Sequence, residues 1–154
     1  MKKEYHFLLI DFPAALKALK AKSPAAWGEM TAIQMLDHLR KGFELSLSKE
    51  KFTVKTPAEH LPKMKDFIQS DKALRPGAAK PYSYDTLPDL ELDFDEMKVE
   101  LMRGMIKMLT HFENVPDHSS IHPSFGELNV QEWLRLHSKH LHHHLLQFSL
   151  IEAE

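Results

Sequence analysis

The sequence predicts an all-α protein, a four-helix bundle with a long crossover between its second and third helices. Two observations support this fold. Apolar residues recur at helical spacing in four segments, and three of these segments begin with a capping-box pattern. A long segment with many prolines, residues 49–92, separates the second helix from the third. The chain has 154 residues, 43% of them apolar, which fits one domain spanning residues 1–154.

The first two helices are predicted from their start and stop signals. Residues 11–22 form the first, because Asp11 can act as the N-cap and Pro13 falls in the first turn. The second runs from about Thr31 to Ser48. Its capping box pairs Thr31 with Gln34, so that each side chain satisfies a backbone donor at the helix start.

The third and fourth helices show the same signals. The third begins at Asp93, with Glu96 three residues later. The fourth begins at Asn129 and runs to about Ile151. The apolar stripe of the third helix has i, i+4 spacing and consists of Met97, Leu101, Met105, Met108, Leu109 and Phe112.

The crossover, residues 49–92, contains Pro57, Pro62, Pro76, Pro81 and Pro88. Residues 57–69 predict a short additional helix, whereas residues 81–92 predict an extended surface crossing. The sequence does not define the path of this segment across the bundle.

Composition excludes several classes of function. The chain has eleven histidines and no cysteine, which excludes a disulfide scaffold, a thiolate metal site and a cysteine nucleophile. The formal net charge of −2 favours neither nucleic acid nor an anionic membrane as a partner. Residues 7–10 are too few for a signal sequence, and no run approaches the ~20 apolar residues of a membrane span. A cytoplasmic location is therefore expected.

The fourth helix turns several imidazoles toward the core. His137, His140, His144 and Gln147 fall in one sector about 100° wide, together with apolar residues. His142 lies on the opposite face. Burying an imidazole without a partner costs roughly 1–3 kcal/mol, so this stripe requires a compensating interaction.

A metal ion would supply that interaction. His140 and His144 have i, i+4 spacing, which places two imidazoles side by side, and His38 also points inward from the second helix. Three neutral nitrogen ligands with an open fourth position suit Zn²⁺, Ni²⁺ or another late first-row ion at a catalytic site. Leu141 follows His140, so the glutamate of the His-Glu-x-x-His motif is absent. The alternative is that these histidines are hydrogen-bonded core residues.

Other residues have two interpretations each. Gln34 and Gln147 share faces with the inward histidines and could orient an imidazole or contact a ligand. Equally, Gln34 could only cap its helix and Gln147 could be a polar group at a helix end. The sequence His122-Pro123-Ser124-Phe125-Gly126 favours a tight turn over a role in lining a pocket.

Two blocks of sequence resemble the DinB/YfiT-like superfamily. The first is residues 27–39, and the second is residues 122–126 followed by Trp133 and residues 140–148. The chain looks closest to a branch without an assigned activity. The resemblance implies a four-helix bundle, often dimeric, with a divalent metal bound by one histidine of the second helix and a His-x-x-x-His pair of the last helix. In this sequence those residues are His38, His140 and His144.

Additional histidines leave the choice of ligands open. His137 and His143 depart from the minimal three-histidine pattern, and His143 with His140 at i, i+3 is a competing pair. His144 is preferred because His143 lies at the edge of the inward stripe. His137 and His143 are then candidates for contacts around the ligands.

The resemblance also implies two kinds of activity. Some superfamily members are transferases or isomerases that use low-molecular-weight thiols, and others are described as metal-dependent hydrolases. We therefore expect a metal-binding homodimer that acts on a small molecule as a hydrolase or thiol transferase, any thiol coming from outside the chain. The alternative is a non-catalytic bundle whose histidines sense metal, store metal or form a dimer interface.

Overall fold

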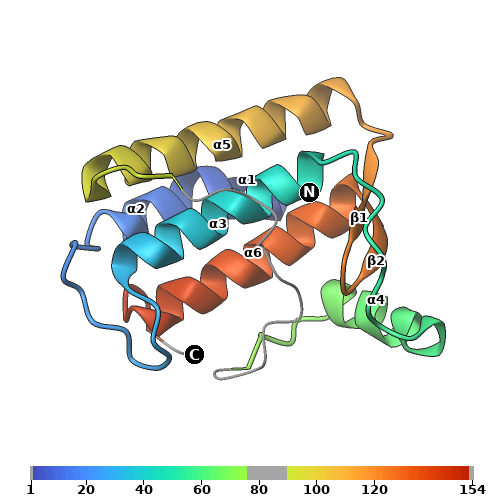
Figure 1. Ribbon diagram of the computed structural model, residues 1–154, viewed down its shortest axis with the longest axis horizontal. Coiled ribbons are helices and arrows are strands. Elements are labelled where there is room, and N and C mark those ends of the chain that lie inside the picture. The colour runs from blue at the N-terminus through green and yellow to red at the C-terminus, as the bar shows by residue number, and fades with distance from the viewer. Residues whose placement is uncertain (1, 76–89, 153–154) are drawn as a thin grey trace.

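The computed structural model describes residues 2–75 and 90–152, so most of the predicted extended stretch, residues 81–92, lies outside the described residues. The chain is mostly helical, with one two-stranded hairpin. In Figure 1 the helices α1, α2, α3, α5 and α6 run lengthwise beside one another, and the hairpin lies at one end.

The three capping boxes mark the starts of the three longest helices. These are α3 (Ala32–Leu47), α5 (Phe94–Asn114) and α6 (Val130–Gln147). In each, the capping residue accepts from a backbone N–H three positions later, and the side chain of that later residue accepts in return. The predicted starts of these three helices are confirmed.

Helix α6 ends at Gln147, earlier than the predicted Ile151. Ser149 adopts a left-handed conformation with φ of 56°, and the N–H of Leu150 donates to the carbonyl of Leu145. This is a Schellman motif with serine at the position where glycine is usual, and it closes the last turn.

The N-terminal helix begins earlier than predicted. Helix α1 (Lys2–His6), a π-helical turn (η1, Phe7–Asp11) and α2 (Phe12–Leu16) form one continuous helical run. The prediction that Asp11 is an N-cap is wrong, because its backbone is helical and its side chain makes no capping bond. Leu8, Phe12 and Leu16 recur every fourth residue and are buried, and this packing extends the helix toward the N-terminus.

This correction leads to a stability prediction. We expect Asn129→Ala to lower the free energy of unfolding by ~1 kcal/mol, because it removes a side-chain cap of α6. Asp11→Ala should change that free energy by no more than about 0.5 kcal/mol, because the contact of its side chain with His6 is exposed. Urea denaturation of both variants tests this, and a loss of ~1 kcal/mol in Asp11→Ala would contradict the continuous helix.

The prediction of an all-α fold needs one correction, a β-hairpin. Strands β1 (Ser119–His122) and β2 (Gly126–Asn129) pair antiparallel, with His122 opposite Gly126. The predicted turn at residues 122–126 is confirmed as the connection between these strands, and Gly126 has the positive φ of 79° that favours glycine. Strands of four residues are too short to give a clear alternating signal in the sequence.

The crossover contains the predicted short helix. A 3-10 turn (η2, Ala58–His60) leads into α4 (Leu61–Gln69), which packs against α6. Two cations of α6 hold the end of α4: Arg135 donates to the carbonyl of Gln69, and Lys139 donates to the carbonyl of Ser70. Cations near the C-terminal carbonyls of a helix stabilise it, so the outer face of α6 fixes the position of α4.

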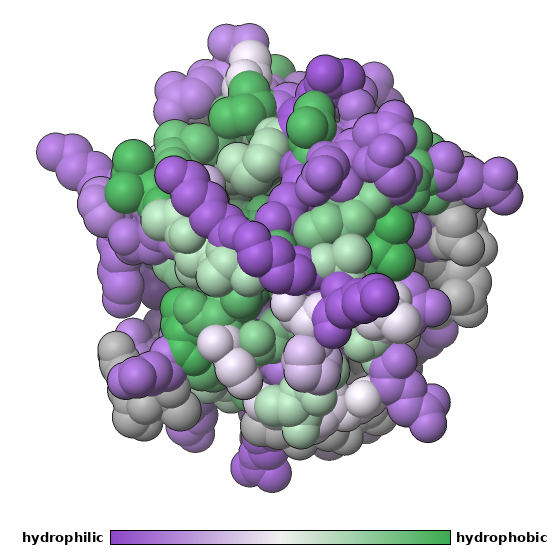
Figure 2. All heavy atoms as spheres, turned by 90° about the vertical axis from the view of Figure 1, so that its left-hand side faces the viewer, coloured by the Kyte–Doolittle hydropathy of each residue, from purple (hydrophilic) through white to green (hydrophobic). Residues whose placement is uncertain are grey.

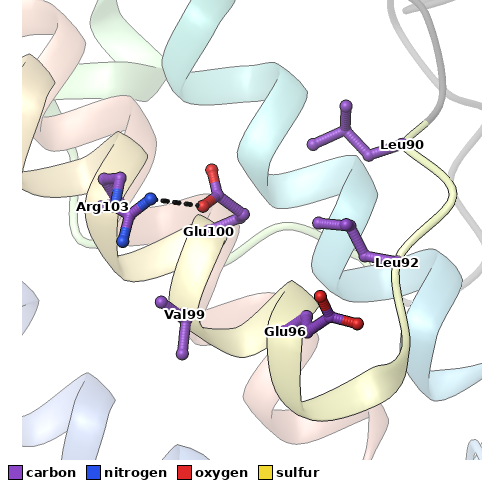
Figure 3. A pocket seen from close by; sticks show the side chains of 6 residues that line it. All are labelled: Leu90, Leu92, Glu96, Val99, Glu100 and Arg103. Carbon is purple, nitrogen blue, oxygen red and sulfur yellow. Dashed lines mark hydrogen bonds and ion pairs between the residues drawn. The ribbon is translucent and has the colours of Figure 1, made fainter.

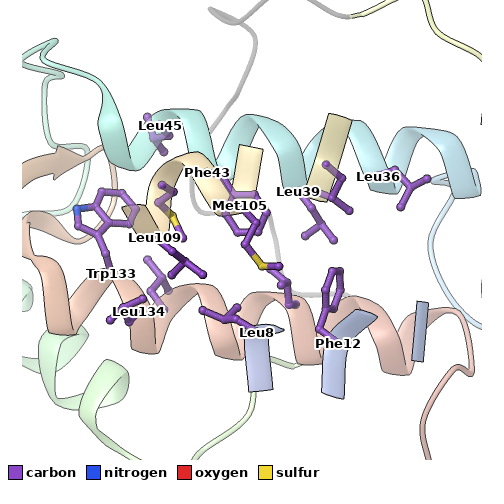
Figure 4. Close-up of a cluster of buried hydrophobic side chains, with 14 of the residues drawn as sticks. Leu8, Phe12, Leu36, Leu39, Phe43, Leu45, Met105, Leu109, Trp133 and Leu134 are labelled. Carbon is purple, nitrogen blue, oxygen red and sulfur yellow. The ribbon is translucent and has the colours of Figure 1, made fainter. Parts of the chain in front are cut away.

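The core lies between α3, α5, α6 and the N-terminal helices. Figure 4 shows side chains from these segments converging, and those labelled are Leu8, Phe12, Leu36, Leu39, Phe43, Leu45, Met105, Leu109, Trp133 and Leu134. On the end of the molecule drawn in Figure 2, hydrophilic side chains interrupt the apolar patches. No helix in the described part of the chain is long and apolar enough to span a membrane.

Candidate metal centre

Three histidines from two helices converge inside the molecule. His38 lies on α3, and His140 and His144 lie one turn apart on α6, which packs against α3. The Nε2 atom of His140 is 2.8 Å from Nε2 of His38 and 3.1 Å from Nε2 of His144. His140 and His144 are buried, whereas His38 is partly exposed. Each residue offers one ligand atom within 4.8 Å of the other two, so the three could hold a metal ion.

The geometry of this cluster fits a tetrahedral ion. With metal–nitrogen bonds of about 2.0–2.1 Å, two nitrogen ligands of a tetrahedral site lie about 3.3–3.4 Å apart. The separations of His140 from His38 and from His144 are slightly shorter than this, so those rings would need to move apart by only a few tenths of an ångström. The rings meet edge to face, with centres 4.7 Å to 5.0 Å apart, which directs the three Nε2 atoms inward.

A hydrogen bond that His144 donates to Gln147 determines which nitrogen of His144 carries the proton. Nδ1 of His144 lies 2.7 Å from Oε1 of Gln147. The amide of Gln147 is oriented by its other end, because Nε2 donates to the carbonyl oxygen of Trp27 at 3.1 Å. Oε1 can only accept, so the neutral His144 ring carries its proton on Nδ1 and presents a lone pair at Nε2. A metal ligand requires that lone pair.

The segment before α3 is attached to the end of α6 by the same glutamine. The backbone carbonyl of Gln147 accepts from the N–H of Ala26 at 2.7 Å. Gly28 has φ of 77°, and a Cβ atom there would lie 3.1 Å from Nε2 of Gln147. A side chain at this position would therefore be strained and would crowd the amide. Sequence reasoning missed this role of Ala26, Trp27 and Gly28, although Trp27-Gly28 opens the first block of resemblance.

The surroundings of His140 keep its ring uncharged. Burial holds the pKa of His140 well below its usual value, and the neighbouring rings of His144, His38, His137 and His143 lower it further. A neutral imidazole is the form that binds a metal ion, so competition from protons is weak at this position.

The remaining predicted residues lie around the cluster or away from it. His143 contacts the rings of Trp27 and His144 at 5.5 Å and 5.1 Å, and among the described residues the convergent group contains His144 and not His143. His137 stacks on Trp133 instead of joining the three ligands. Gln34 is exposed, and its side-chain oxygen accepts from the N–H of Thr31 in the capping box of α3.

An open pocket lies elsewhere, on α5. It has a volume of about 420 Å³ and is lined by Leu90, Leu92, Glu96, Val99, Glu100 and Arg103 (Figure 3). Two of these residues, Glu100 and Arg103, form an ion pair whose atoms are 2.8 Å apart. None of the three convergent histidines lines this pocket, so it is not part of the candidate metal centre.

Comparison with known protein families identifies the family to which the chain belongs. A family model described as "Protein of unknown function (DUF1569)" matches residues 4–150. The chain belongs to the DUF1569 family. This family is part of the DinB/YfiT-like superfamily, which agrees with the resemblance of the two sequence blocks. A search of curated proteins gave no match for this DUF1569 protein.

Proposed function

We propose that this DUF1569 protein binds one divalent late first-row metal ion through His38, His140 and His144 and uses the open coordination position to act on a small molecule. The observation that carries this proposal is the convergence of three Nε2 atoms from two helices. The hydrogen bond from Nδ1 of His144 to Oε1 of Gln147, which leaves the lone pair of His144 at Nε2, supports it. Zinc and nickel are the ions that suit three imidazoles best.

The donor set favours an enzymatic role for the ion. Three neutral ligands leave the full charge of the ion uncompensated, and such an ion lowers the pKa of a bound water toward ~7 or deprotonates a bound thiol. The chain has no cysteine, so a thiol would be a separate low-molecular-weight molecule. We therefore propose metal-dependent hydrolysis or thiol transfer, with the histidines holding the ion and Gln147 orienting one of them.

Membership of the superfamily supports two further parts of the proposal. The N-terminal helices, α3, α5 and α6 would be the four members of a DinB-like bundle, and two copies would form a homodimer. Size-exclusion chromatography with light scattering tests the second part, because a monomer at micromolar concentration would contradict it.

The metal content of protein purified without an affinity tag tests the proposal directly. We expect about one equivalent of a divalent ion per chain by elemental analysis, since one three-histidine site binds one ion. A histidine tag must be avoided because it binds the same ions. Less than about a tenth of an equivalent, unchanged after addition of zinc or nickel and dialysis, would contradict metal binding at this site.

Activity assays with metal-loaded protein then separate the enzyme from the alternative. Ester hydrolysis and consumption of a low-molecular-weight thiol report the two proposed reactions, and protein stripped of metal by a chelator is the control. Activity that disappears with the metal supports the enzyme. A metal-loaded protein that is silent in both assays favours a role in sensing or storing the metal.

A further inference from the structure

A second pair of histidines lies in the core beside Trp133, apart from the three convergent ligands. The ring of His137 stacks on the indole of Trp133, with centres 5.4 Å apart and planes inclined by 21°. The ring of His122 approaches the same indole, with centres 5.6 Å apart. All three side chains are at most 3% exposed. Figure 4 shows Trp133 at one end of the hydrophobic cluster, and both imidazoles contact its indole there.

Both imidazoles of this pair are uncharged at neutral pH. Burial lowers the pKa of His137 to about 3 and that of His122 to about 3, with the neighbouring His137 contributing to the shift at His122. Each ring therefore has one N–H donor and one nitrogen acceptor. The hairpin turn determines which ring nitrogen of His122 carries the proton. Its Nδ1 accepts from the backbone N–H groups of Ser124 and Phe125 at 2.9 Å and 3.3 Å. The proton of His122 thus lies on Nε2.

Three buried polar atoms around these rings have no hydrogen-bond partner among the residues that the structure describes. They are Nε1 of Trp133, Nε2 of His137 and Oγ of Ser124. Buried polar groups in native proteins nearly always have a partner, either from the protein or from ordered water. Trp133 and His137 are in contact through their rings, and Ser124 belongs to the turn that bonds to His122. One small molecule bound among these groups would satisfy several of them at once.

We propose that a single buried water molecule binds beside Trp133, accepting a hydrogen bond from Nε1 of Trp133 and donating one to Nε2 of His137. Water suits the site because it both accepts and donates: the indole N–H of Trp133 can only donate, and Nε2 of His137 accepts in the tautomer that carries its proton on Nδ1. The walls of the site are aromatic: Phe43 contacts His137, and Phe125 contacts His122, with ring centres 5.1 Å and 4.9 Å apart. Buried waters of this kind make two to four hydrogen bonds and are part of the folded structure.

The chain offers a clean spectroscopic test in the wild-type protein, and this test does not depend on metal binding. It contains two tryptophans, so a ¹⁵N-labelled sample gives two indole N–H signals, and Trp133→Phe identifies which one is Trp133. We expect a dipolar cross-peak between the Trp133 indole N–H and a long-lived water in NOESY and ROESY spectra of the metal-free protein. The same cross-peak must persist in Ser124→Ala, which excludes relay through the serine hydroxyl. Its absence in the wild-type protein would overturn the proposal.

Substitution of His137 gives a second test, because the direction in which the melting temperature changes depends on whether water is bound. If water is bound, His137→Phe removes one of its partners and leaves the Trp133 indole poorly satisfied, so the melting temperature of the metal-free protein should fall. If the site is dry, the same substitution replaces an unpaired imidazole by an apolar ring of similar shape, and the melting temperature should rise. A rise accompanied by no cross-peak in the wild-type protein would refute the bound water.

Discussion

Replacement of His140 by alanine is expected to reduce the metal content from about one equivalent to under a tenth, because it removes the central member of a three-ligand site. The Nε2 atom of His140 is the one that approaches both other ligands, at 2.8 Å and 3.1 Å. Elemental analysis of the untagged variant after dialysis against zinc or nickel measures this loss. His38→Ala and His144→Ala should lose the metal for the same reason.

The matched control for these variants is His142→Ala. His142 lies on the same helix but its ring contacts Phe7, with centres 6.3 Å apart, so its removal should leave the metal content unchanged. Circular dichroism establishes that each variant is folded before its metal content is compared. Retention of metal in folded His140→Ala would contradict the proposed centre. Loss in His143→Ala together with retention in His144→Ala would instead show that His143 is the ligand.

Substitution of Gln147 by leucine is expected to weaken metal binding about 10–100-fold, which is the usual effect of removing a hydrogen-bond partner of a ligand. The side chain is buried and accepts from Nδ1 of His144 at 2.7 Å. Without this acceptor the proton of His144 can occupy either ring nitrogen, and only one of the two forms presents a lone pair at Nε2. Zinc titration against a competing chelator measures the change in affinity.

The tautomer of His144 can be observed separately from metal affinity. In metal-free protein, the ¹⁵N chemical shifts of the His144 ring should show a proton on Nδ1 in the wild type and a mixture of forms in Gln147→Leu. Gln147→Glu keeps an acceptor near Nδ1, so it should retain the Nδ1–H form although it loses the donor to the carbonyl of Trp27. A wild-type affinity in folded Gln147→Leu would show that Gln147 does not position the ligand.

Gln34 provides the control for a glutamine substitution at the other helix. It also shares a face with an inward histidine in the sequence pattern, but its side-chain oxygen accepts from the N–H of Thr31 at 2.9 Å. Gln34→Leu should therefore affect the start of α3 and leave the metal affinity unchanged. A comparable loss of affinity in Gln34→Leu and Gln147→Leu would indicate a general structural effect.

The sequence by itself determined the features that depend on local interactions. The helix starts at Thr31, Asp93 and Asn129 follow from side chains that bond to backbone groups three residues away. The inward faces of α3 and α6 follow from helical periodicity, and the same pattern predicts the three histidines that the fold brings together. Both kinds of signal involve only residues that lie within a few helical turns of one another in the sequence.

Only the tertiary structure decided the features that depend on residues far apart. The start of the N-terminal helix depends on packing of Leu8 and Phe12 in the core, and this packing outweighs the capping propensity of Asp11. The short hairpin is formed by strand pairing across a turn. Strands of four residues are too short for their sequence pattern to predict this pairing. The orientation of His144 depends on Gln147, whose own amide is oriented by the Trp27 carbonyl at a separation of 120 residues. A helical pattern shows which side chains face inward, but it carries no information about the partner that each one meets there.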